Sequence, residues 1–430
     1  MRKTTVKHLS AVLAGFVLFF CMPLSVSAAE QTADPGDTAW ILISSALVLL
    51  MLPGLALFYG GMVRKKNVLS SMMHIFAAIG VVGVQWVVVG YTLAFGPEGG
   101  SFIGGFGKMF LKGVGPESLS GTIPELVFVM FQGMFAIITP ALIAGAIAER
   151  VKFGPYLIFI LLWTTLIYDP LAHWVWGEGG WLLEMGALDF AGGTVVHISS
   201  GVSALAAIWI IGKRKGWPKT PMLPHNMTFT LLGAGLLWFG WFGFNAGSAL
   251  AANGSAALAF ANTQVAAASA CCTWMLGEWL YQKRPSALGV ASGIVAGLVA
   301  ITPAAGFVSP AASIVIGGVA GILCYAAVIM KGKLGYDDSL DAFGIHGVGG
   351  TWGALATGIF VTVGGTGLLA GNTKQFFVQL ISVVAVAAYV FVGTLILVKI
   401  IDALIGFRVS PDDETVGLDE TIHGETGYNL

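Results

Sequence analysis

Apolar residues dominate this chain in long stretches that are separated by short polar or Gly-rich segments. Each stretch holds about 20 apolar residues, the length that an α-helix needs to cross a hydrocarbon layer about 30 Å thick. Because backbone groups inside a membrane must be satisfied within helices, the predicted fold class is an all-α polytopic membrane protein. The pattern predicts eleven transmembrane helices, at residues 38–62, 68–95, 123–148, 155–176, 191–212, 226–248, 257–281, 286–306, 311–330, 340–362 and 375–403.

Lysine and arginine predict how these helices are oriented. Of the 21 Lys and Arg residues, three fall in the first 28 residues, and Lys108, Lys112 and Lys374 fall on one side of the predicted helices. Because cytoplasmic loops carry the excess of positive charge, we expect the mature N-terminus outside the cell (inner) membrane and the tail from Gly406 in the cytoplasm. The fifteen residues on the cytoplasmic side are Arg64, Lys65, Lys66, Arg150, Lys152, Lys213, Arg214, Lys215, Lys219, Lys283, Arg284, Lys331, Lys333, Lys399 and Arg408.

The chain begins with a segment typical of a signal peptide at residues 1–28. It has a basic start, an apolar run over residues 11–20 and small residues before Ala29. An uncleaved first membrane span is the alternative. Residues 29–403 then form the transmembrane domain, and residues 404–430 form a cytoplasmic C-terminal tail.

The predicted helices divide into two sets of five, at residues 38–212 and 226–362. Because five is odd, the second set must enter the membrane from the opposite side. This is the arrangement of an inverted repeat, and such proteins place their binding sites at the repeat interface near the midplane. The helix at 375–403 has no counterpart, and we expect it to brace the two repeats.

Composition agrees with a membrane protein and narrows the function. The chain is 56% hydrophobic and 10% charged, against about a quarter charged in soluble domains. The net charge of −1 gives no reason to expect a nucleic-acid partner. The 60 glycines indicate closely packed helices. The four cysteines show no metal-ligand spacing, and we expect no metal and no cofactor.

Two histidines lie deep in predicted helices. Residues 186–201 read GALDFAGGTVVHISSG, so His197 follows Asp189 by eight residues, or roughly 12 Å of helix. Residues 337–353 read DDSLDAFGIHGVGGTWG and place His346 in a second Gly-rich helix that also starts on an acid. An ionisable residue at membrane depth indicates a functional site. We expect His197 and His346 to meet near the midplane and line one conduction path; two hydrogen-bonded structural histidines are the alternative.

Aromatic residues gather near one mouth of this predicted path. The sixth predicted helix ends in WFGWFGFNAGS, with Trp241, Phe242, Phe244 and Ser248. Ring faces and a hydroxyl group form a weak site for a cation. An aromatic belt at the membrane surface is the alternative. Residues on the same side are Trp176, which ends the fourth predicted helix, and Phe131 and Phe135, which are one turn apart in the third.

Acidic residues near the predicted helix ends have simpler interpretations. Asp189 is interpreted first as an N-cap that accepts hydrogen bonds from backbone N–H groups, and second as a direct ligand of a cation. Glu149 and Arg150 are adjacent in sequence and are predicted to form an interfacial ion pair.

Six segments together resemble the ammonium transporter family, Amt, of the Amt/Mep/Rh group. The resemblance covers nearly the whole mature chain. The segments are PGLALFYGG at 53–61, GAIAERVKF at 145–153, DFAGGTVVH at 189–197, WFGFNAGS at 241–248, ITPAAG at 301–306 and FGIHGVGG at 343–350.

The resemblance implies a homotrimer with one pore for ammonium or ammonia in each subunit. It implies an outer recruitment site formed by Trp176 and Ser248 with Phe135, near which Asp189 is needed structurally. It implies a gate of Phe135 stacked on Phe244, and a pore past His197 and His346, to which we add Trp241 and Phe131. The tail GLDETIHGETGY at 417–428 resembles a family tail that couples subunits and supports blocking by a PII-type protein.

Two local features depart from the family pattern. The turn WGEGGW at 176–181 is one residue longer than expected and adds Glu178, which puts the geometry of the outer mouth in question. Met134 stands beside Phe135 and could change the fit of the gate.

The expected mechanism is that ammonium binds at the mouth, loses a proton and crosses as ammonia, because a dry pore excludes any ion that stays charged. The proton either returns outside or travels separately along the histidines. One alternative is an Rh-type channel for neutral ammonia or carbon dioxide. Another is an ammonium sensor that signals through the tail. An enzyme is not expected, because no oriented base or strained nucleophile turn is evident. Metal transport would need more ligands at depth.

Overall fold

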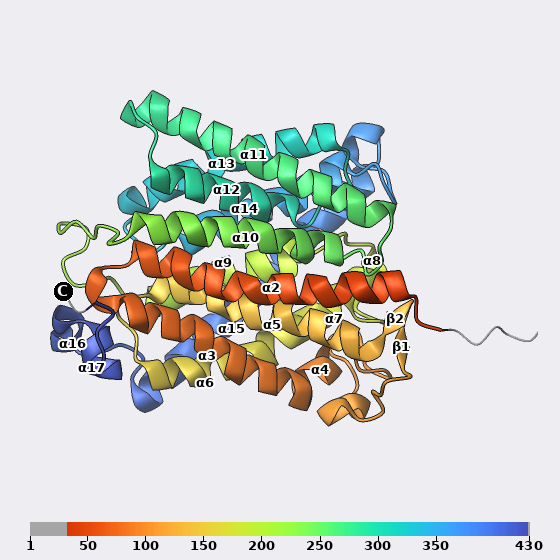
Figure 1. The fold of residues 1–430 in the computed structure, drawn as a ribbon, viewed down its shortest axis with the longest axis horizontal. Coiled ribbons are helices and arrows are strands. Elements are labelled where there is room, and N and C mark those ends of the chain that lie inside the picture. Colours follow the sequence, from red (N-terminus) through yellow and green to blue (C-terminus); the bar gives the residue numbers. More distant parts are fainter. Residues whose placement is uncertain (1–31, 429–430) are drawn as a thin grey trace, which may run out of the picture. The chain divides into compact units, whose positions relative to one another are not determined.

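The computed structural model describes residues 32–428, so the predicted signal peptide at 1–28 lies outside the described residues. Long helices run side by side between two ends of the bundle (Figure 1). We name these the tail end, where α16 and α17 lie, and the strand end, where β1 and β2 lie. The α-helices are α2 (Pro35–Met62), α3 (Val68–Gln85), α4 (Tyr91–Phe95), α5 (Glu125–Ile147), α6 (Phe153–Trp163), α7 (Asp169–Trp176), α8 (Trp181–Met185), α9 (Ser199–Ile211), α10 (Met227–Gly247), α11 (Gly254–Gln282), α12 (Ala287–Ile301), α13 (Pro310–Leu334), α14 (Val348–Phe360), α15 (Thr373–Ile405), α16 (Pro411–Val416) and α17 (Leu418–His423).

Shorter elements complete the fold. The strands β1 (Leu119–Ser120) and β2 (Ile123–Pro124) pair antiparallel, with Ser120 opposite Ile123. Turns of 3-10 helix are η1 (Lys65–Asn67), η3 (Phe106–Leu111) and η7 (Leu368–Ala370). In the described part of the chain, four π-helical turns interrupt the long helices, namely η2 (Trp86–Gly90), η4 (Thr164–Tyr168), η5 (Gly193–Ile198) and η6 (Phe343–Gly347).

Within residues 32–428, eight helical stretches are long and apolar enough to cross a membrane. They are Pro35–Met62, Lys65–Phe95, Glu125–Ile147, Phe153–Met185, Gly193–Ile211, Met227–Gly247, Pro310–Leu334 and Thr373–Ile405.

The three other predicted spans are also largely helical but do not meet that criterion. The range 257–281 lies in α11, whose apolar character is diluted by small and polar residues such as Asn262 and Thr263. The range 286–306 contains α12, which has only 15 residues and ends at Ile301, two residues before Pro303. The range 340–362 holds η6 and α14.

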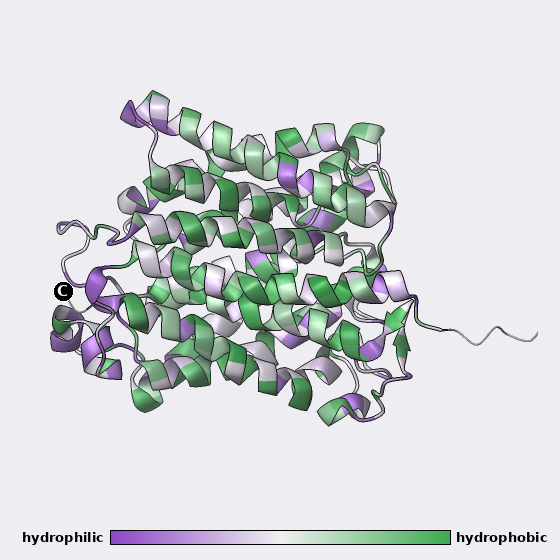
Figure 2. Ribbon diagram, viewed as in Figure 1, coloured by the Kyte–Doolittle hydropathy of each residue, from purple (hydrophilic) through white to green (hydrophobic). Residues whose placement is uncertain are grey.

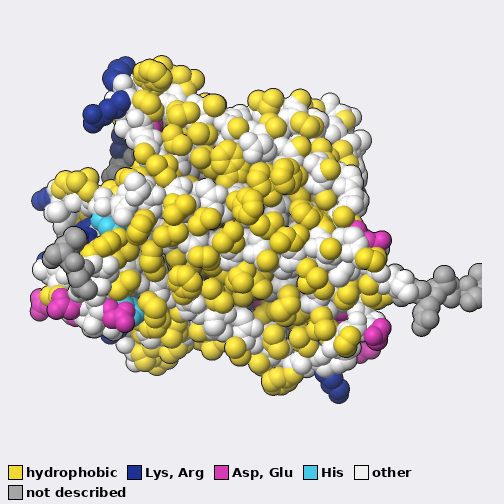
Figure 3. All heavy atoms as spheres, viewed as in Figure 1, with side chains coloured by type: hydrophobic (Ala, Val, Ile, Leu, Met, Phe, Trp, Pro, Cys, Tyr) yellow, Lys and Arg dark blue, Asp and Glu magenta, His cyan; other side chains and the backbone are white. Residues whose placement is uncertain are grey.

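Apolar and charged side chains are segregated along the bundle. Apolar residues cover the long helices, whereas polar residues gather at the two ends (Figure 2). Charged side chains on the visible face also lie at the ends, with an apolar belt between them (Figure 3). This distribution is what a helical protein shows when its middle faces hydrocarbon.

Glycines allow α2 and α10 to pack at very short range. A Cβ atom added at Gly233 of α10 would lie 2.3 Å from the backbone nitrogen of Phe58 in α2. One added at Gly61 of α2 would lie 2.4 Å from the Thr230 hydroxyl of α10. Because dispersion depends on close contact, small residues are what membrane helices use where their backbones approach.

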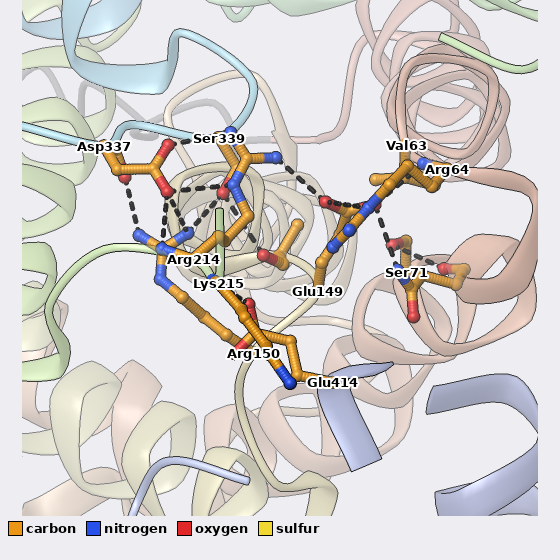
Figure 4. Close-up of polar contacts among 12 residues, drawn as sticks. Val63, Arg64, Ser71, Glu149, Arg150, Arg214, Lys215, Asp337, Ser339 and Glu414 are labelled. Carbon is orange, nitrogen blue, oxygen red and sulfur yellow. Dashed lines mark hydrogen bonds and ion pairs between the residues drawn. The ribbon is translucent and has the colours of Figure 1, made fainter. Parts of the chain in front are cut away.

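A network of charged residues joins several chain segments at the tail end (Figure 4). The Glu149 carboxylate lies between two guanidinium groups, 3.0 Å from Nε of Arg64 and 2.9 Å from Nη1 of Arg214. Arg214 also binds Asp337 at 2.7 Å. Burial alone would raise the pKa of Glu149, but the Arg214 and Arg64 charges outweigh it and hold the pKa below its ordinary value.

The predicted ion pair between Glu149 and Arg150 is wrong. Glu149 has a φ of 72°, in the left-handed region, so its side chain and that of the next residue point to different partners. Arg150 instead donates to the carbonyl oxygens of Ala146 and Asp337, at 3.0 and 2.6 Å. The two charges therefore serve different contacts although they are adjacent in sequence.

The tail from residue 404 packs against the same end of the bundle. Glu414 of α16 accepts hydrogen bonds from the Lys215 backbone and, at 2.9 Å, from the Arg408 guanidinium. The Asp419 carboxylate of α17 accepts from the backbone N–H groups of Leu69 and Ser70, at 3.1 and 2.8 Å. The tail is thus bound to the first turn of α3 and to the segment after α9.

Candidate functional site

Asp189 positions the helix that carries His197. Its carboxylate accepts hydrogen bonds from the backbone N–H groups of Gly192, Gly193 and Thr194, at 2.8, 2.6 and 2.7 Å, and from the Thr194 hydroxyl. Gly192 has a φ of 109°, a conformation that favours glycine. These bonds satisfy the free donors at the start of η5, as the first interpretation of Asp189 requires.

Asp338 does the same for the helix that carries His346. Its carboxylate accepts from the backbone N–H groups of Ala342 and Phe343, at 3.1 and 2.8 Å. Asp338 precedes His346 by eight residues, the same spacing that separates Asp189 from His197. The sequence reasoning did not single out Asp338, although this shared spacing could have identified it. Burial, reinforced by Asp341, raises the pKa of Asp338 to about 6.

The two histidines meet in the centre of the bundle. Their Nδ1 atoms are 3.3 Å apart, and their rings are stacked with centroids 5.3 Å apart. Both side chains are buried. The helices can approach because glycines face each other beside the histidines: a Cβ atom at Gly201 would lie 2.1 Å from the Gly347 nitrogen.

A narrow cavity of about 10 Å³ surrounds this pair, room for about one water molecule. Its walls are apolar apart from the imidazoles and one indole. The bordering residues are Met51, Leu55, Phe58, Ile138, Leu142, Val196, His197, Leu237, Trp241, Phe244, Val295 and His346. Three of the four predicted pore residues therefore border it. Phe131 does not; its ring packs edge-on against Phe135 with centroids 5.0 Å apart.

A stacked aromatic pair separates this cavity from a second one. The rings of Phe135 and Phe244 are stacked with centroids 4.1 Å apart. Phe244 borders the histidine cavity, whereas Phe135 borders a vestibule of about 210 Å³ on the other side. Nothing can pass from the vestibule to the histidines along this line unless the two rings move.

The vestibule brings together Trp176, Ser248 and Phe135. The Trp176 ring stands at 90° to Phe135, and its Nε1–H donates to the Asp189 carbonyl at 2.9 Å. The Ser248 hydroxyl donates to the Phe244 carbonyl at 2.8 Å. Since a hydroxyl has one proton, the lone pairs of Ser248 stay available as acceptors. Two ring systems and a hydroxyl oxygen are thus presented to one space.

A family model described as the Ammonium Transporter Family matches residues 39–428. The chain belongs to this family. It is 52% identical to an ammonium transporter of Bacillus subtilis (strain 168) over 401 residues, which cover 91% of this chain and 98% of that protein. The crystal structure of Candida albicans Mep2 matches with a TM-score of 0.84 at 40% identity, covering 90% of this chain and 89% of that one. A structure titled Sensor Amt Protein matches with a TM-score of 0.83 at 31% identity, covering 89% and 97%. The family consists of membrane-spanning transporters and not of enzymes.

Within this ammonium transporter family member, three residues named from the sequence lie outside the lining of the vestibule. Glu178 is exposed and does not border the vestibule, and neither does Met134. Phe242 was expected in the aromatic cluster, but its ring stacks on Phe260 of α11 with centroids 4.0 Å apart. Of residues 176–181, Trp176 borders the vestibule and Glu178 does not.

Two further polar residues of the transporter were missed by the sequence reasoning. Gln132 borders the vestibule and adds an amide group beside the aromatic rings. Thr302 lies behind the histidine cavity, where its hydroxyl oxygen is 2.9 Å from Nε1 of Trp241 and 3.3 Å from Nε2 of His197. Thr302 belongs to the segment ITPAAG, so its position in a family motif was the available signal.

Proposed function

We propose that this protein conducts ammonium across the membrane by recruiting the cation in the vestibule and passing ammonia by the two histidines. The proposal is supported by the order of three features along one line. These are an aromatic vestibule, a closed stack of Phe135 and Phe244, and a narrow apolar cavity with His197 and His346. The vestibule suits a cation, whereas the cavity suits a small neutral molecule.

Recruitment is electrostatic. The ring faces of Trp176 and Phe135 attract a cation, and the free lone pairs of Ser248 accept an N–H hydrogen bond. Asp189 acts indirectly, because its carboxylate is occupied at the start of η5. Potassium shares the attraction to rings, so selectivity requires a second step.

The second step is loss of a proton. An ion that stays charged has a large desolvation cost in the histidine cavity. Ammonium escapes this cost by giving up a proton, which either returns to the water outside or travels separately along the histidines. Ammonia then passes Trp241 and the imidazoles, which offer hydrogen-bond groups in an otherwise apolar wall. A potassium ion has no such route.

We also propose that all eleven helical stretches cross the membrane as two inverted repeats with α15 as a brace. The repeated device of an acid, a π-helical turn and a histidine eight residues later supports a common origin of the two halves. The mature N-terminus then lies outside the cell (inner) membrane, and the tail lies in the cytoplasm.

The assembly proposed is a homotrimer embedded in membrane lipid, with the tail open to a PII-type protein. Large apolar side chains are exposed on α11, for example Trp279 and Leu280, and these suit either lipid or a neighbouring subunit. The mass of the purified protein in detergent tests the assembly.

The transport proposal is tested with purified protein in liposomes. Ammonium is applied and the current is measured, with potassium as the control ion. A current with ammonium and none with potassium supports conduction in which charge moves with the substrate. No current together with an internal pH change indicates the Rh-type gas channel instead. If neither signal appears, the protein is not a transporter under these conditions and the proposal fails.

Variants test the pore assignment in the same liposomes. His197→Ala and His346→Ala are expected to change ammonium transport or its selectivity over potassium. If both variants retain wild-type transport and selectivity, the pore does not pass the histidines. The sensor alternative has the likeness to the Sensor Amt Protein structure in its favour. It predicts instead that removing residues 404–430 abolishes signalling while transport is absent from the start.

A further inference from the structure

Thr302 is a hydrogen-bond hub behind the histidine pair. Among the described residues, its fully buried hydroxyl oxygen has three partners: the Leu298 carbonyl oxygen at 2.8 Å, Nε1 of Trp241 at 2.9 Å and Nε2 of His197 at 3.3 Å. A hydroxyl group has one proton to donate and two lone pairs with which to accept. Three partners therefore use its full capacity, and each role can be assigned.

Two of the three partners of the Thr302 hydroxyl have fixed hydrogen-bonding roles. A carbonyl oxygen can only accept, so the short contact with Leu298 must contain the Thr302 proton. The indole N–H of Trp241 can only donate, so it takes one lone pair of Thr302. What is left on Thr302 is one acceptor site. His197 can bind there only if its Nε2 carries a proton.

The proton on Nε2 then fixes the second histidine. A neutral imidazole has one protonated nitrogen, so Nδ1 of His197 holds a lone pair. The contact of 3.3 Å between the two Nδ1 atoms needs one proton, and this proton must belong to His346. Nε2 of His346 is consequently unprotonated, and within residues 32–428 no hydrogen-bond partner of this atom is found.

We propose that Thr302 is a positioning residue that sets the tautomers of both histidines, so that the pair presents one open acceptor, Nε2 of His346. The inference rests on the proposed function, since it describes how the same pore handles protons. His197 stacks on Phe244 of the gate, whereas His346 does not, so the open acceptor is on the far side of His197 from the gate.

This arrangement bears on the route of the proton. An ammonium ion that passes the gate reaches His197 first, but both ring nitrogens of His197 are already engaged. A proton cannot pass along the pair from the gate until the bond between His197 and Thr302 is broken. Ammonia beyond His197 can donate an N–H to His346. The hydroxyl of Thr302 thus allows ammonia to pass while it blocks the transfer of a proton along the two histidines.

The experiment is ¹⁵N NMR of histidine-labelled protein in lipid, because protonated and unprotonated ring nitrogens give well-separated signals. The signals that disappear in the His197→Gln variant belong to His197, and those that disappear in the His346→Gln variant belong to His346. The wild type is expected to show His197 protonated at Nε2 and His346 at Nδ1, with at least about a tenfold bias, which one hydrogen bond can supply. Thr302→Val, which keeps the shape and removes the hydroxyl, is expected to bring the two tautomers within about threefold of each other.

Thr302→Ser is the matched control, because it keeps the hydroxyl and should restore the wild-type signals. A wild-type spectrum with His197 protonated at Nδ1 would overturn the inference without reference to any variant. So would an unchanged tautomer ratio in folded Thr302→Val. If the tautomers are as expected but the liposomes show neither ammonium current nor pH change, the proposed function fails while the tautomer assignment stands.

Discussion

Replacing Gly201 by alanine should push the two histidine helices apart. The added Cβ atom would lie 2.1 Å from the Gly347 nitrogen and 2.5 Å from its Cα. Backbone atoms cannot turn away as a flexible side chain can. To bring the closest contact from 2.1 Å to an ordinary 3.4 Å, α9 and η6 must separate by about 1.3 Å.

The histidines cannot absorb that displacement. Gly201 is one helical turn after His197, and Gly347 is next to His346. A separation of about 1.3 Å added to the present 3.3 Å between the Nδ1 atoms gives about 4.6 Å, beyond hydrogen-bond distance. Overpacking of this kind also costs about 1–3 kcal/mol of stability. Gly201→Ala should therefore lower both ammonium transport and the unfolding midpoint.

The assay pairs the liposome measurement with thermal unfolding in detergent. Gly235→Ala in α10 is the matched control, because no described atom outside the adjoining backbone of α10 lies within 4 Å of the added Cβ. There the better helix propensity of alanine should leave stability unchanged or raise it by up to about 1 kcal/mol. If Gly201→Ala transports and melts like Gly235→Ala, the short glycine contact does not set the distance between the histidines, and the reasoning is refuted.

Three further predictions use other parts of the molecule. Phe244→Ala removes one ring of the stacked pair, so the vestibule and the histidine cavity should join. Water should then enter the cavity and lower the desolvation cost that excludes potassium, so a potassium current should appear in liposomes; continued exclusion of potassium would show that the rings do not keep the cavity closed to ions. Glu149→Gln leaves two guanidinium groups around a neutral amide and should cost about 3–5 kcal/mol in denaturant unfolding, whereas exposed Glu178→Gln should change little; equal effects would contradict the network. The raised pKa of Asp338, about 6 against an ordinary value of 3.8, means that its protonated form stabilises the fold below about pH 4 and that this contribution is lost as the pH rises through 6. Asp338→Asn should remove this part of the pH dependence, and unfolding curves of the two proteins that stay parallel from pH 4 to 7 would rule it out.

The helices could be predicted from the sequence, because the thickness of the membrane sets the length of each apolar stretch. The predicted range 375–403 and the observed α15 (Thr373–Ile405) differ by two residues at each end. The π-helical turns could not be predicted from the sequence, because their i→i+5 hydrogen-bond pattern is stabilised by packing between helices that are distant in the sequence. The end of α12 at Ile301 was not predicted, and the proline rule does not explain it, because Thr302 before Pro303 still has helical dihedral angles.

The site was predicted as a set of residues but not as a network. Trp176, Ser248, Phe135, Phe244 and the histidines stand in recognisable segments, and the structure brings them into two adjoining cavities. Contacts between segments that are far apart in the sequence could not be predicted, because the sequence does not give the distances between them. Glu149 binds residues 85 and 65 positions away rather than its neighbour, because a left-handed backbone turn redirects it.

The two histidines differ because different residues surround them, although both belong to the same repeated arrangement of an acid, a π-helical turn and a histidine. Both helices start at an acid, open into a π-helical turn and carry a histidine eight residues after the acid. His197 additionally stacks on Trp241 and Phe244 and meets the Thr302 hydroxyl, whereas the ring of His346 meets that of His197. A symmetric scaffold alone would give two equivalent imidazoles and no preferred direction for the proton between them. A preferred direction for the proton therefore has to come from residues outside the repeated device. In this structure these residues are Trp241 and Thr302, whose indole and hydroxyl groups lie behind His197.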